Sequence, residues 1–491
     1  MQKSRVRRVG ALIVGLSLVA AACGDDDDPA DVADSVVDEV DEEMSEAEDE
    51  MSEEMSEMSE EMSEEMSEMS EEMSEESSEM AEESSEMTEE SSEMTEESSA
   101  EAPAGGADGT LRIGGLLPET GNLAFLGPPE IAGVNLAVQD INAAGGVNGA
   151  DVEYLPGDSG DSGEVANATV DRLLAEDVDA FIGAASSGVS LTVIDKITQA
   201  GKIHFSPANT SPTFTDYDDN DLYFRTAPSD VVQGAALADT MLADGAATAA
   251  FLVLNDSYGT GLQQYTIEPY TAGGGSVVYG DMGTTYDPQA ENFDAEIAAV
   301  VDANPDAVVI IGFDETAQIL GGLIEAGFGP SDKLVYGTDG NMGNALAAQF
   351  DDPSVVAGMK GTLPGVDVEG ELADFRDRLL EVDGELVDYS YSAEAYDAIV
   401  VMALAASIAG SDDGVAVAAE INGVTRDGEK CTDYAGCLEL VEAGTDIDYD
   451  GVSGPLEFID AGEPSQASIL ILQFDAEGAI EVIGSVQGSI S

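Results

Sequence analysis

Strand-like and helix-like segments alternate along the chain from residue 111 onward, and this alternation limits its fold more than any other feature. A first series runs from the β-rich segment 111–118 to the segment 202–207, and a second series runs from 230 to 337. Regular alternation builds parallel sheets that are flanked by helices on both faces. Two series predict an α/β protein with two lobes. Ligands of such sheets bind beyond the carboxyl ends of the strands, so a small-molecule site is expected between the lobes.

Apolar residues at helical spacing define the predicted helices, and short β-rich runs define the strands. The predicted helices are 130–146, 164–177, 190–201, 230–243, 259–272, 289–303, 315–326, 372–381 and 392–410. The predicted strands are 111–118, 152–158, 179–184, 202–207, 248–254, 276–281, 306–312 and 333–337, and FDAEG at 474–478 is typical of a hairpin turn. We expect the apolar helix 392–410 to be buried and not to span a membrane, because it carries Glu394 and Asp397.

Charge excludes several classes of function. The 491 residues include 15 Lys and Arg against 102 Asp and Glu, a net charge of −87. Nucleic-acid binding through a basic surface needs Lys and Arg, and so does docking on an anionic bilayer. We therefore expect no nucleic-acid partner and no membrane contact through basic residues.

Few residues are available for catalysis. His204 is the only histidine, which excludes a multi-histidine metal site. A Ser-His-Asp triad would have to use this one residue, and GxSxG, P-loop and GxGxxG motifs are all absent from the sequence. Because His204 lies in an apolar strand beside Phe205, we expect it in the core or at its rim. The sequence favours a binding protein without a cofactor over an enzyme.

The first 23 residues resemble a bacterial lipoprotein signal. Four basic residues precede the apolar run Val9–Ala22, which is too short to cross a bilayer as a helix. Ala20–Ala22 lead directly into Cys23. The resemblance implies that Cys23 is diacylated and becomes the first residue of a chain anchored to the outer face of the cell membrane. The alternatives are an ordinary signal peptide with a chance cysteine, or a short anchor helix.

Residues 24–109 form a low-complexity spacer with 38 acidic residues and no basic one. Methionines recur at steps of 3, 4 and 7, which would place them on one face of a helical stalk. Closely spaced glutamates repel one another on a helix, and high charge with low hydrophobicity is typical of disorder. We expect an extended, disordered tether, with a helical stalk as the alternative.

The remainder resembles a known family in several segments whose order and spacing agree. The first is LLPETGNLAFLGPPEIAGVNLAVQDINAAGG, which opens the segment 116–160. The others are IGAASSGVSLTVID (182–195), HFSPANTSPTF (204–214), LNDSYGTGLQ (254–263), IIGFDETAQIL (310–320) and VYGTDGN (335–341). They resemble type I periplasmic binding proteins, and most closely the leucine/isoleucine/valine-binding branch of ABC-importer receptors. The resemblance implies two lobes joined by three crossovers, which close on a ligand by hinge bending. The first lobe would comprise 110–228 plus about 358–454, and the second 229–357 plus about 455–491.

The family's amino-acid site can be carried over residue by residue. Ser187 and Thr210 match donors to the ligand's α-carboxylate, and Ala208 matches the carbonyl that accepts from its ammonium group. Asp339 stands where the family often has a glutamate that faces the ammonium. The predicted site is Phe125, Leu126, Ser186, Ser187, Ala208, Asn209, Thr210, Tyr258, Phe313, Asp339 and Gly340. Leu126 and Phe313 replace tyrosines, so the resemblance implies the amino-acid class and not leucine specificity.

Simpler roles are open for several of these residues. Ser186 and Ser187 could cap the helix that follows, and Thr210 could be a turn hydroxyl between two prolines. Tyr258 could serve packing alone, and Asp339 before Gly340 could form an ordinary Asp-Gly turn.

The C-terminal third offers two further features. Cys431 and Cys437 are close in sequence, and in an exported protein this favours a structural disulfide. The segment 446–457 matches the spacing of a calcium loop, with Asp446, Asp448, Asp450 and Glu457 as ligands. A proline inside the loop and the lack of flanking helices argue against calcium, so we expect no metal.

Taken together, the sequence predicts a monomeric, lipid-anchored solute receptor that delivers an amino acid or a related small polar solute to ABC permease subunits. The alternative from another class is a sensory module that reports ligand binding to a membrane partner without transport. Two hypotheses remain: an enzyme, and a structural surface protein whose main feature is the acidic segment.

Overall fold

The computed structural model describes residues 108–370 and 372–490. The predictions for the signal peptide, for Cys23 and for residues 24–107 of the acidic spacer lie outside the described residues. The last two spacer residues belong to the folded part, because the backbone N–H groups of Asp108, Gly109 and Thr110 donate to one carboxylate oxygen of Asp412, at 2.8–3.1 Å.

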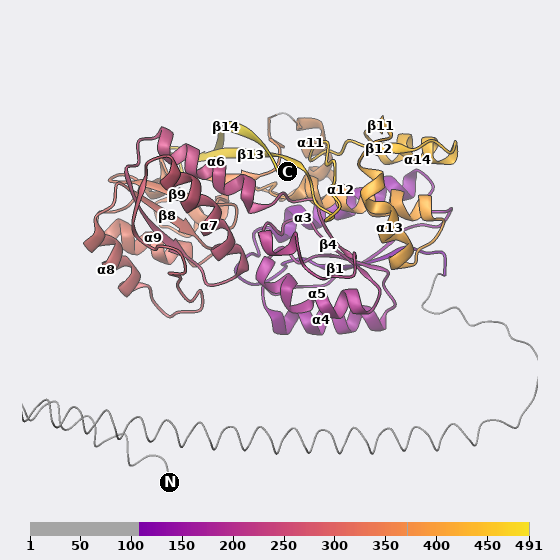
Figure 1. The fold of residues 1–491 in the computed structure, drawn as a ribbon, viewed down its shortest axis with the longest axis horizontal. Coiled ribbons are helices and arrows are strands. Elements are labelled where there is room, and N and C mark those ends of the chain that lie inside the picture. Colours follow the sequence, from indigo (N-terminus) through magenta and orange to yellow (C-terminus); the bar gives the residue numbers. More distant parts are fainter. Residues whose placement is uncertain (1–107, 371, 491) are drawn as a thin grey trace, which may run out of the picture. The chain divides into compact units, whose positions relative to one another are not determined.

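A five-stranded parallel sheet forms the first lobe, with the strand order β2-β1-β3-β4-β5. Its strands are β1 (Arg112–Leu116), β2 (Glu153–Leu155), β3 (Ala180–Gly183), β4 (Ile203–Ser206) and β5 (Tyr223–Arg225). Helices cover both faces of this sheet (Figure 1). They are α4 (Gly163–Ala175) and α5 (Ser187–Gln199) on one face, with α3 (Gly127–Ala143), α12 (Ser392–Ala409) and α13 (Gly414–Val424) on the other.

A seven-stranded sheet forms the second lobe, with the order β14-β13-β10-β9-β8-β6-β7. Its strands are β6 (Thr248–Val253), β7 (Ser276–Tyr279), β8 (Ala307–Ile311), β9 (Leu334–Gly337), β10 (Lys360–Pro364), β13 (Gln466–Phe474) and β14 (Ile480–Ser489). The first five run parallel, whereas β13 and β14 form an antiparallel hairpin at one edge, joined at the predicted turn. The helices of this lobe are α6 (Asp230–Ala243), α7 (Ser257–Ala272), α8 (Asp294–Ala303), α9 (Thr316–Glu325) and α10 (Asn344–Ala348).

The chain passes between the two sheets three times: after β5, after β10 and before β13. The two-lobed α/β class with parallel sheets and flanking helices is confirmed. The predicted lobe boundary near 358 needs a correction, since β10 pairs with β9 and β13 and so belongs to the second lobe. We therefore propose that the second crossover begins after Pro364.

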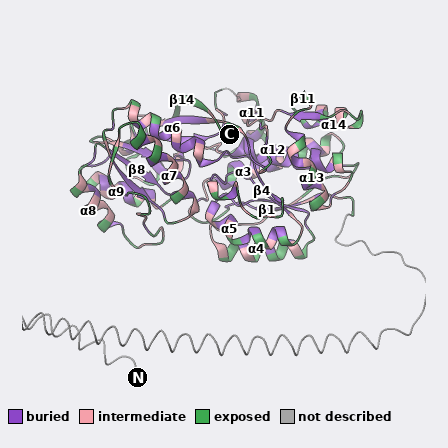
Figure 2. Cartoon of the chain, in the orientation of Figure 1, coloured by how far each residue is buried: buried purple, intermediate pink, exposed green. Residues whose placement is uncertain are grey.

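Helix α12 is the most deeply buried helix of the first lobe (Figure 2). It is apolar and long enough for a membrane span, but 83% of its apolar window is buried inside the protein, as predicted. Its closest neighbour is α3, where a Cβ at Gly133 would lie 2.2 Å from the carbonyl oxygen of Ser392. Only glycine allows this approach, and the approach lets both helices bury their apolar faces.

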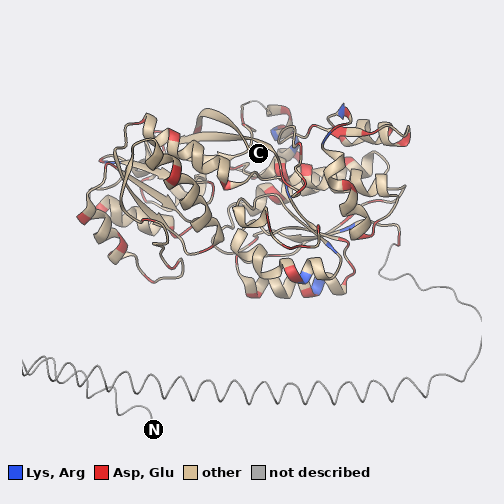
Figure 3. Cartoon of the chain, viewed as in Figure 1, with Lys and Arg blue, Asp and Glu red and all other residues tan. Residues whose placement is uncertain are grey.

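The predicted helices and long strands match the structure to within a few residues, apart from the start of α8. The predicted helix 372–381 corresponds to α11 (Ala373–Val382). The elements that were not predicted are β5, β10, α10, α13 and a small C-terminal unit. This unit consists of β11 (Glu429–Cys431), α14 (Tyr434–Glu442) and β12 (Ile447–Tyr449), and β11 pairs with β12. Acidic side chains are spread over the helices and loops of both lobes, whereas basic ones are few (Figure 3).

Candidate functional site

A small cavity of about 250 Å³ lies where strands of both sheets end. Its walls follow the carboxyl ends of β3, β4, β6, β8 and β9, as expected for parallel sheets. Nine of the eleven predicted site residues line it: Leu126, Ser186, Ser187, Ala208, Thr210, Tyr258, Phe313, Asp339 and Gly340. The cavity is also lined by Leu123, Ala185 and Tyr391. The structure thus brings residues that are as far apart in the sequence as Leu126 and Gly340 together around one cavity.

The start of α5 forms part of the first-lobe wall. Ser186 caps the helix, because its hydroxyl accepts a hydrogen bond from the backbone N–H of Val189 at 3.3 Å. Ser187 has another role, since its hydroxyl accepts from the backbone N–H of Ser211 at 3.3 Å. The helix N-terminus carries partial positive charge and free N–H groups. This wall can therefore receive a carboxylate.

The loop after β4 completes the first-lobe wall. The Ser206 hydroxyl accepts from the backbone N–H groups of Ala208 and Asn209, at 3.2 and 3.0 Å. The Asn209 amide donates to the carbonyl oxygens of Ala184 and Ala185, at 3.0 and 2.8 Å. The side chain of Asn209 thus fixes the loop, and Asn209 is not among the residues that line the cavity.

Arg225, at the end of β5, supports the same loop from behind and was missed at the sequence level. Its guanidinium donates to the carbonyl oxygens of Asn209 and Ser211, at 3.1 and 2.7 Å. It also forms a fully buried ion pair with Glu463. The adjacent Thr210 hydroxyl is 1% exposed and has no hydrogen-bond partner within the described part of the chain. Arg225 is thus a positioning residue for the loop that presents Thr210.

The second-lobe wall is centred on Asp339. One of its carboxylate oxygens accepts from Tyr258 at 2.8 Å and from Gln233 at 2.7 Å, and the other accepts from Tyr391 at 2.8 Å. Burial raises the pKa of Asp339. The Tyr258 ring stacks on Phe313 with 5.6 Å between centroids, which gives the wall an aromatic surface.

A second buried acid, Asp230, lies close to Asp339 and was also missed. Its backbone N–H donates to the carbonyl oxygen of Thr210 at 2.8 Å, which ties the start of α6 to the first-lobe loop. Burial, reinforced by the charge of Asp339, raises the pKa of Asp230 well above its usual value. Both of its carboxylate oxygens are buried, and neither has a partner among residues 108–490 as described. Two such acids make this side of the cavity a place for a cationic group.

Tyr391 is the third residue that the sequence did not reveal. It precedes α12 with a φ of 60°, a left-handed conformation that costs energy for a tyrosine. This conformation directs its hydroxyl toward Asp339. No local sequence signal marks such a residue, because its role depends on a contact 52 positions away.

Two of the predicted residues have other positions. Phe125 lines a neighbouring cavity with Phe313, Gly340 and Gly343. Phe313 and Gly340 line the central cavity as well. His204 is fully buried in β4, as expected for a core residue. Its ring packs edge-on against the ring of Tyr223, with 5.2 Å between the ring centroids. Burial lowers the pKa of His204 to about 4, so the ring is neutral at pH 7.

Acidic groups from both lobes meet beside the cavity. Burial, together with the charges of Asp256 and Glu315, raises the pKa of Asp161 to about 7. Burial also raises the pKa of Asp256 to about 6, and a Cβ at Gly188 would lie only 3.0 Å from a carboxylate oxygen of Asp256. Neither Lys nor Arg pairs with these acids in the described residues. The interface between the lobes therefore carries uncompensated negative charge.

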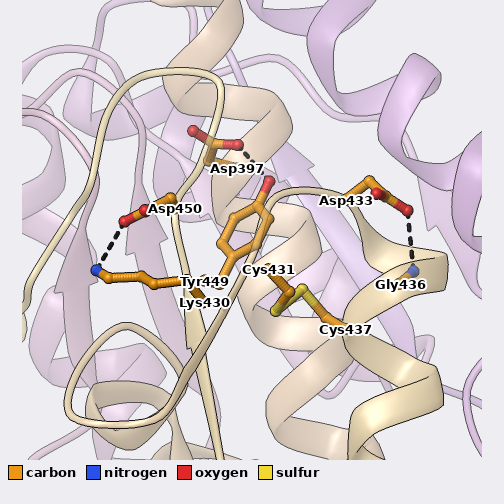
Figure 4. Close-up of a disulfide and its surroundings, with 8 residues drawn as sticks. All are labelled: Asp397, Lys430, Cys431, Asp433, Gly436, Cys437, Tyr449 and Asp450. Atoms are coloured by element: carbon orange, nitrogen blue, oxygen red, sulfur yellow. Dashed lines mark hydrogen bonds and ion pairs between the residues drawn. A yellow bond between two sulfur atoms is a disulfide. The ribbon is translucent and has the colours of Figure 1, made fainter.

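The C-terminal unit contains the disulfide, and three of the four residues with calcium-loop spacing lie near it. Cys431 and Cys437 are bonded to each other, which confirms their pairing (Figure 4). Asp448, Asp450 and Glu457 do converge, but around the ammonium group of Lys430, at 2.8, 2.9 and 3.0 Å. Asp446 does not join this group. Lys430 supplies the positive charge that a calcium ion would otherwise bring.

Two lobes with a small, charged and aromatic cavity where their strands end are typical of a solute-binding protein. A family model described as "Periplasmic binding protein" matches residues 110–479, and the chain belongs to this family. Membership implies a location outside the cytoplasm. The predicted kinship with the leucine/isoleucine/valine-binding branch of type I receptors is confirmed.

Individual relatives agree with this assignment. The chain is 28% identical over 370 residues to a chemotactic signal transduction system substrate-binding protein of Halobacterium salinarum. The aligned residues cover 72% of this chain and 84% of the relative. It is 29% identical over 325 residues to a Leu/Ile/Val-binding protein homolog of Brucella abortus. This alignment covers 64% of this chain and 81% of the relative. The fold matches a branched-chain amino acid transporter substrate-binding protein of Streptococcus pneumoniae, solved with isoleucine, at a TM-score of 0.64 and 22% identity. That match covers 78% of this chain and all of the other.

Proposed function

We propose that this protein is an extracytoplasmic solute receptor that binds an amino acid, or a closely related small polar solute, and delivers it to an ABC importer. The observation that carries the proposal is the asymmetry of the cavity. Its first-lobe wall offers hydroxyls and a helix N-terminus, and its second-lobe wall offers the buried carboxylate of Asp339, with Asp230 nearby. A zwitterion has complementary groups at its two ends.

The binding mode follows from these walls. The α-carboxylate of the solute would accept hydrogen bonds from Ser187, Thr210 and the N–H groups at the start of α5. The ammonium group would donate to Asp339, to Asp230 and to the carbonyl oxygen of Ala208. Tyr258, Phe313, Leu126 and Tyr391 would then contact the side chain of the solute.

Closure of the lobes would signal to the permease that a solute is bound. Each lobe holds only half of the contacts, so the ligand stabilises the closed arrangement in which both halves meet. The permease would recognise this closed form, and the solute would leave unchanged, without enzymatic chemistry and without a cofactor. We further propose that Cys23 carries the lipid anchor, that the acidic spacer keeps the monomeric receptor clear of the membrane, and that the Lys430 cluster needs no metal.

A thermal-shift screen of the purified full-length chain tests the proposal. The panel contains the L-amino acids, their amides, urea and short carboxylic acids. A ligand that binds only the folded state raises Tm by mass action, and at a hundredfold excess over Kd the stabilisation is about 2.7 kcal/mol. We expect one or more amino acids to raise Tm and the acids without an ammonium group to have no effect. A shift by carboxylic acids alone would refute the amino-acid class.

One observation favours a second candidate function. The relative from Halobacterium salinarum is described as part of a chemotactic signal transduction system. In a sensory role the closed receptor would bind a membrane signalling protein and not a permease. Crosslinking in intact cells, with and without the solute, separates the two functions by the membrane partner that is captured.

A further inference from the structure

A second, larger cavity lies at the hinge, outside the proposed solute site. We call it the hinge cavity; it is a pocket open to solvent, with an empty volume of about 600 Å³, between the end of β10, the segment before α12 and the β13–β14 hairpin. Leu363, Leu470 and Leu472 are buried in its wall, and Val482 lies at its rim with 37% of its surface exposed. The apolar surface can hold a hydrocarbon or an aromatic body.

The polar side of the hinge cavity is acidic and lacks Lys and Arg. Besides Glu394, three acids line it. Asp388 accepts from Asn344 at 2.7 Å, and Asp367 accepts from the backbone N–H of Gly370 at 2.8 Å. Burial, together with the charges of Asp367 and Asp388, raises the pKa of Glu369. Glu394, on the first turn of α12, is 3% exposed, and its carboxylate has no side-chain donor in the described part of the chain. One of its oxygens lies 2.9 Å from the position that a Cβ on Gly365 would occupy. Because Gly365 also lines the cavity, this carboxylate borders it.

Glu394 also faces other acids from the elements packed around it. Glu130 of α3 is fully buried, its two carboxylate oxygens have no partner among the described residues, and its pKa is raised by burial and by the charge of Glu394. Burial, together with the charge of Asp397, raises the pKa of Glu394 to about 8. Asp397 accepts four hydrogen bonds, from Tyr449, from Ser453 twice and from Val452, and so is satisfied locally. A cation beside Glu394 would relieve the repulsion between the remaining two acids.

We propose that the hinge cavity is a second binding site, for an organic amine whose ammonium group pairs with Glu394 and whose apolar body lies on Leu363, Leu470 and Leu472. Tyr389 and Tyr391 also line the cavity, and aromatic rings attract ammonium groups. An anion of the same size would meet four acidic side chains and no basic one. The site therefore selects a cation with an apolar body.

Isothermal titration calorimetry on the full-length protein tests this site with three matched probes: n-hexylammonium, hexan-1-ol and hexanoate. We expect hexylammonium to bind at least tenfold more tightly than hexan-1-ol, and hexanoate not to bind. Titration in buffers of different ionisation heat should show proton release near pH 7, because the ammonium group displaces the proton that Glu394 holds. Equal binding of hexanoate, or binding without proton release, would overturn the proposal.

Variants distinguish this cavity from the solute site. Glu394→Gln keeps the shape but removes the charge, and should abolish proton release and weaken hexylammonium at least fivefold. Val482→Trp fills the exposed rim without disturbing the core, and should block hexylammonium while the amino-acid thermal shift persists. Tyr391 lines both cavities, so Asp339→Asn is the necessary control. If Asp339→Asn removes hexylammonium binding and Val482→Trp does not, the amine occupies the solute site and the hinge-cavity proposal fails, whereas the proposed function remains.

Discussion

The two walls of the central cavity are built in different ways. The first-lobe wall is mostly backbone and hydroxyl, and its shape is imposed from behind by Arg225 and the Asn209 side chain. The second-lobe wall consists of side chains that bond directly to one another, with Asp339 at the centre. A substitution behind the first wall should therefore change the shape of the site, whereas a substitution in the second should change its charge. The predictions below test this contrast.

We expect the largest loss of stability from a substitution of Arg225. Arg225→Met leaves Glu463 buried without its partner, and breaking a buried ion pair costs about 3–5 kcal/mol of stability. The carbonyl oxygens of Asn209 and Ser211 also lose their donor, so solute affinity should fall as well. Chemical denaturation and calorimetry measure the two effects.

A double variant separates charge from shape at this position. Arg225→Met with Glu463→Gln removes the uncompensated charge and should recover part of the stability, since neither partner is then left ionised. The loop remains unsupported, so affinity should stay low. Full recovery of affinity would show that Arg225 does not position the first-lobe wall.

Asp339→Ala should produce the largest loss of affinity caused by charge alone. Removing a buried carboxylate that pairs with an ammonium group is expected to weaken binding by about a hundredfold, or ~2.7 kcal/mol. Asp332→Ala, at an exposed position of the same lobe, is the matched control and should bind normally. An unchanged Kd in Asp339→Ala would remove the second-lobe wall from the site.

Ser186 and Ser187 provide a matched pair within the first-lobe wall. Ser187→Ala should weaken the solute by about tenfold, or ~1.4 kcal/mol, because a donor to its carboxylate is lost. Ser186→Ala should instead lower stability by about 1 kcal/mol through the lost helix cap, with a smaller effect on Kd. Identical behaviour of the two variants would contradict the separate roles of the adjacent serines.

The success of prediction from sequence differed between the two kinds of wall. Residues that follow directly after strands, such as Ser187, Thr210 and Asp339, were identified correctly as neighbours in space, because parallel strands end at one edge of a sheet. The sequence did not reveal that the Asn209 side chain bonds to the backbone of Ala184 and Ala185. Adjacent residues of a loop point in different directions, and only tertiary contacts decide which one faces the cavity.

The residues that were missed have their partners far away in the chain. Arg225 bonds to Glu463, 238 positions later, and Tyr391 bonds to Asp339, 52 positions earlier. Asp230 starts a helix and reads locally as an ordinary first-turn acid. The fold class follows from hydrophobic periodicity, which is a local property, whereas these contacts depend on how the chain crosses between the lobes.

The smallest expected effect concerns the acids that meet where the two lobes join. Closure brings Asp161 of the first lobe beside Asp256 and Glu315 of the second, and the pKa values of all three are raised by burial in this arrangement. The closed form therefore binds more protons than separated lobes would, so lowering the pH from 8 to 6 favours closure. Solute affinity should rise by roughly threefold to tenfold over this interval, since a shift of one pKa unit corresponds to a factor of ten. Asp161→Asn removes the only first-lobe member of the group and should flatten the profile, with higher affinity at pH 8 than the wild type. If calorimetry at pH 6, 7 and 8 gives parallel profiles for both proteins, the acids do not oppose closure, and the contrast between the lobes is confined to the cavity itself.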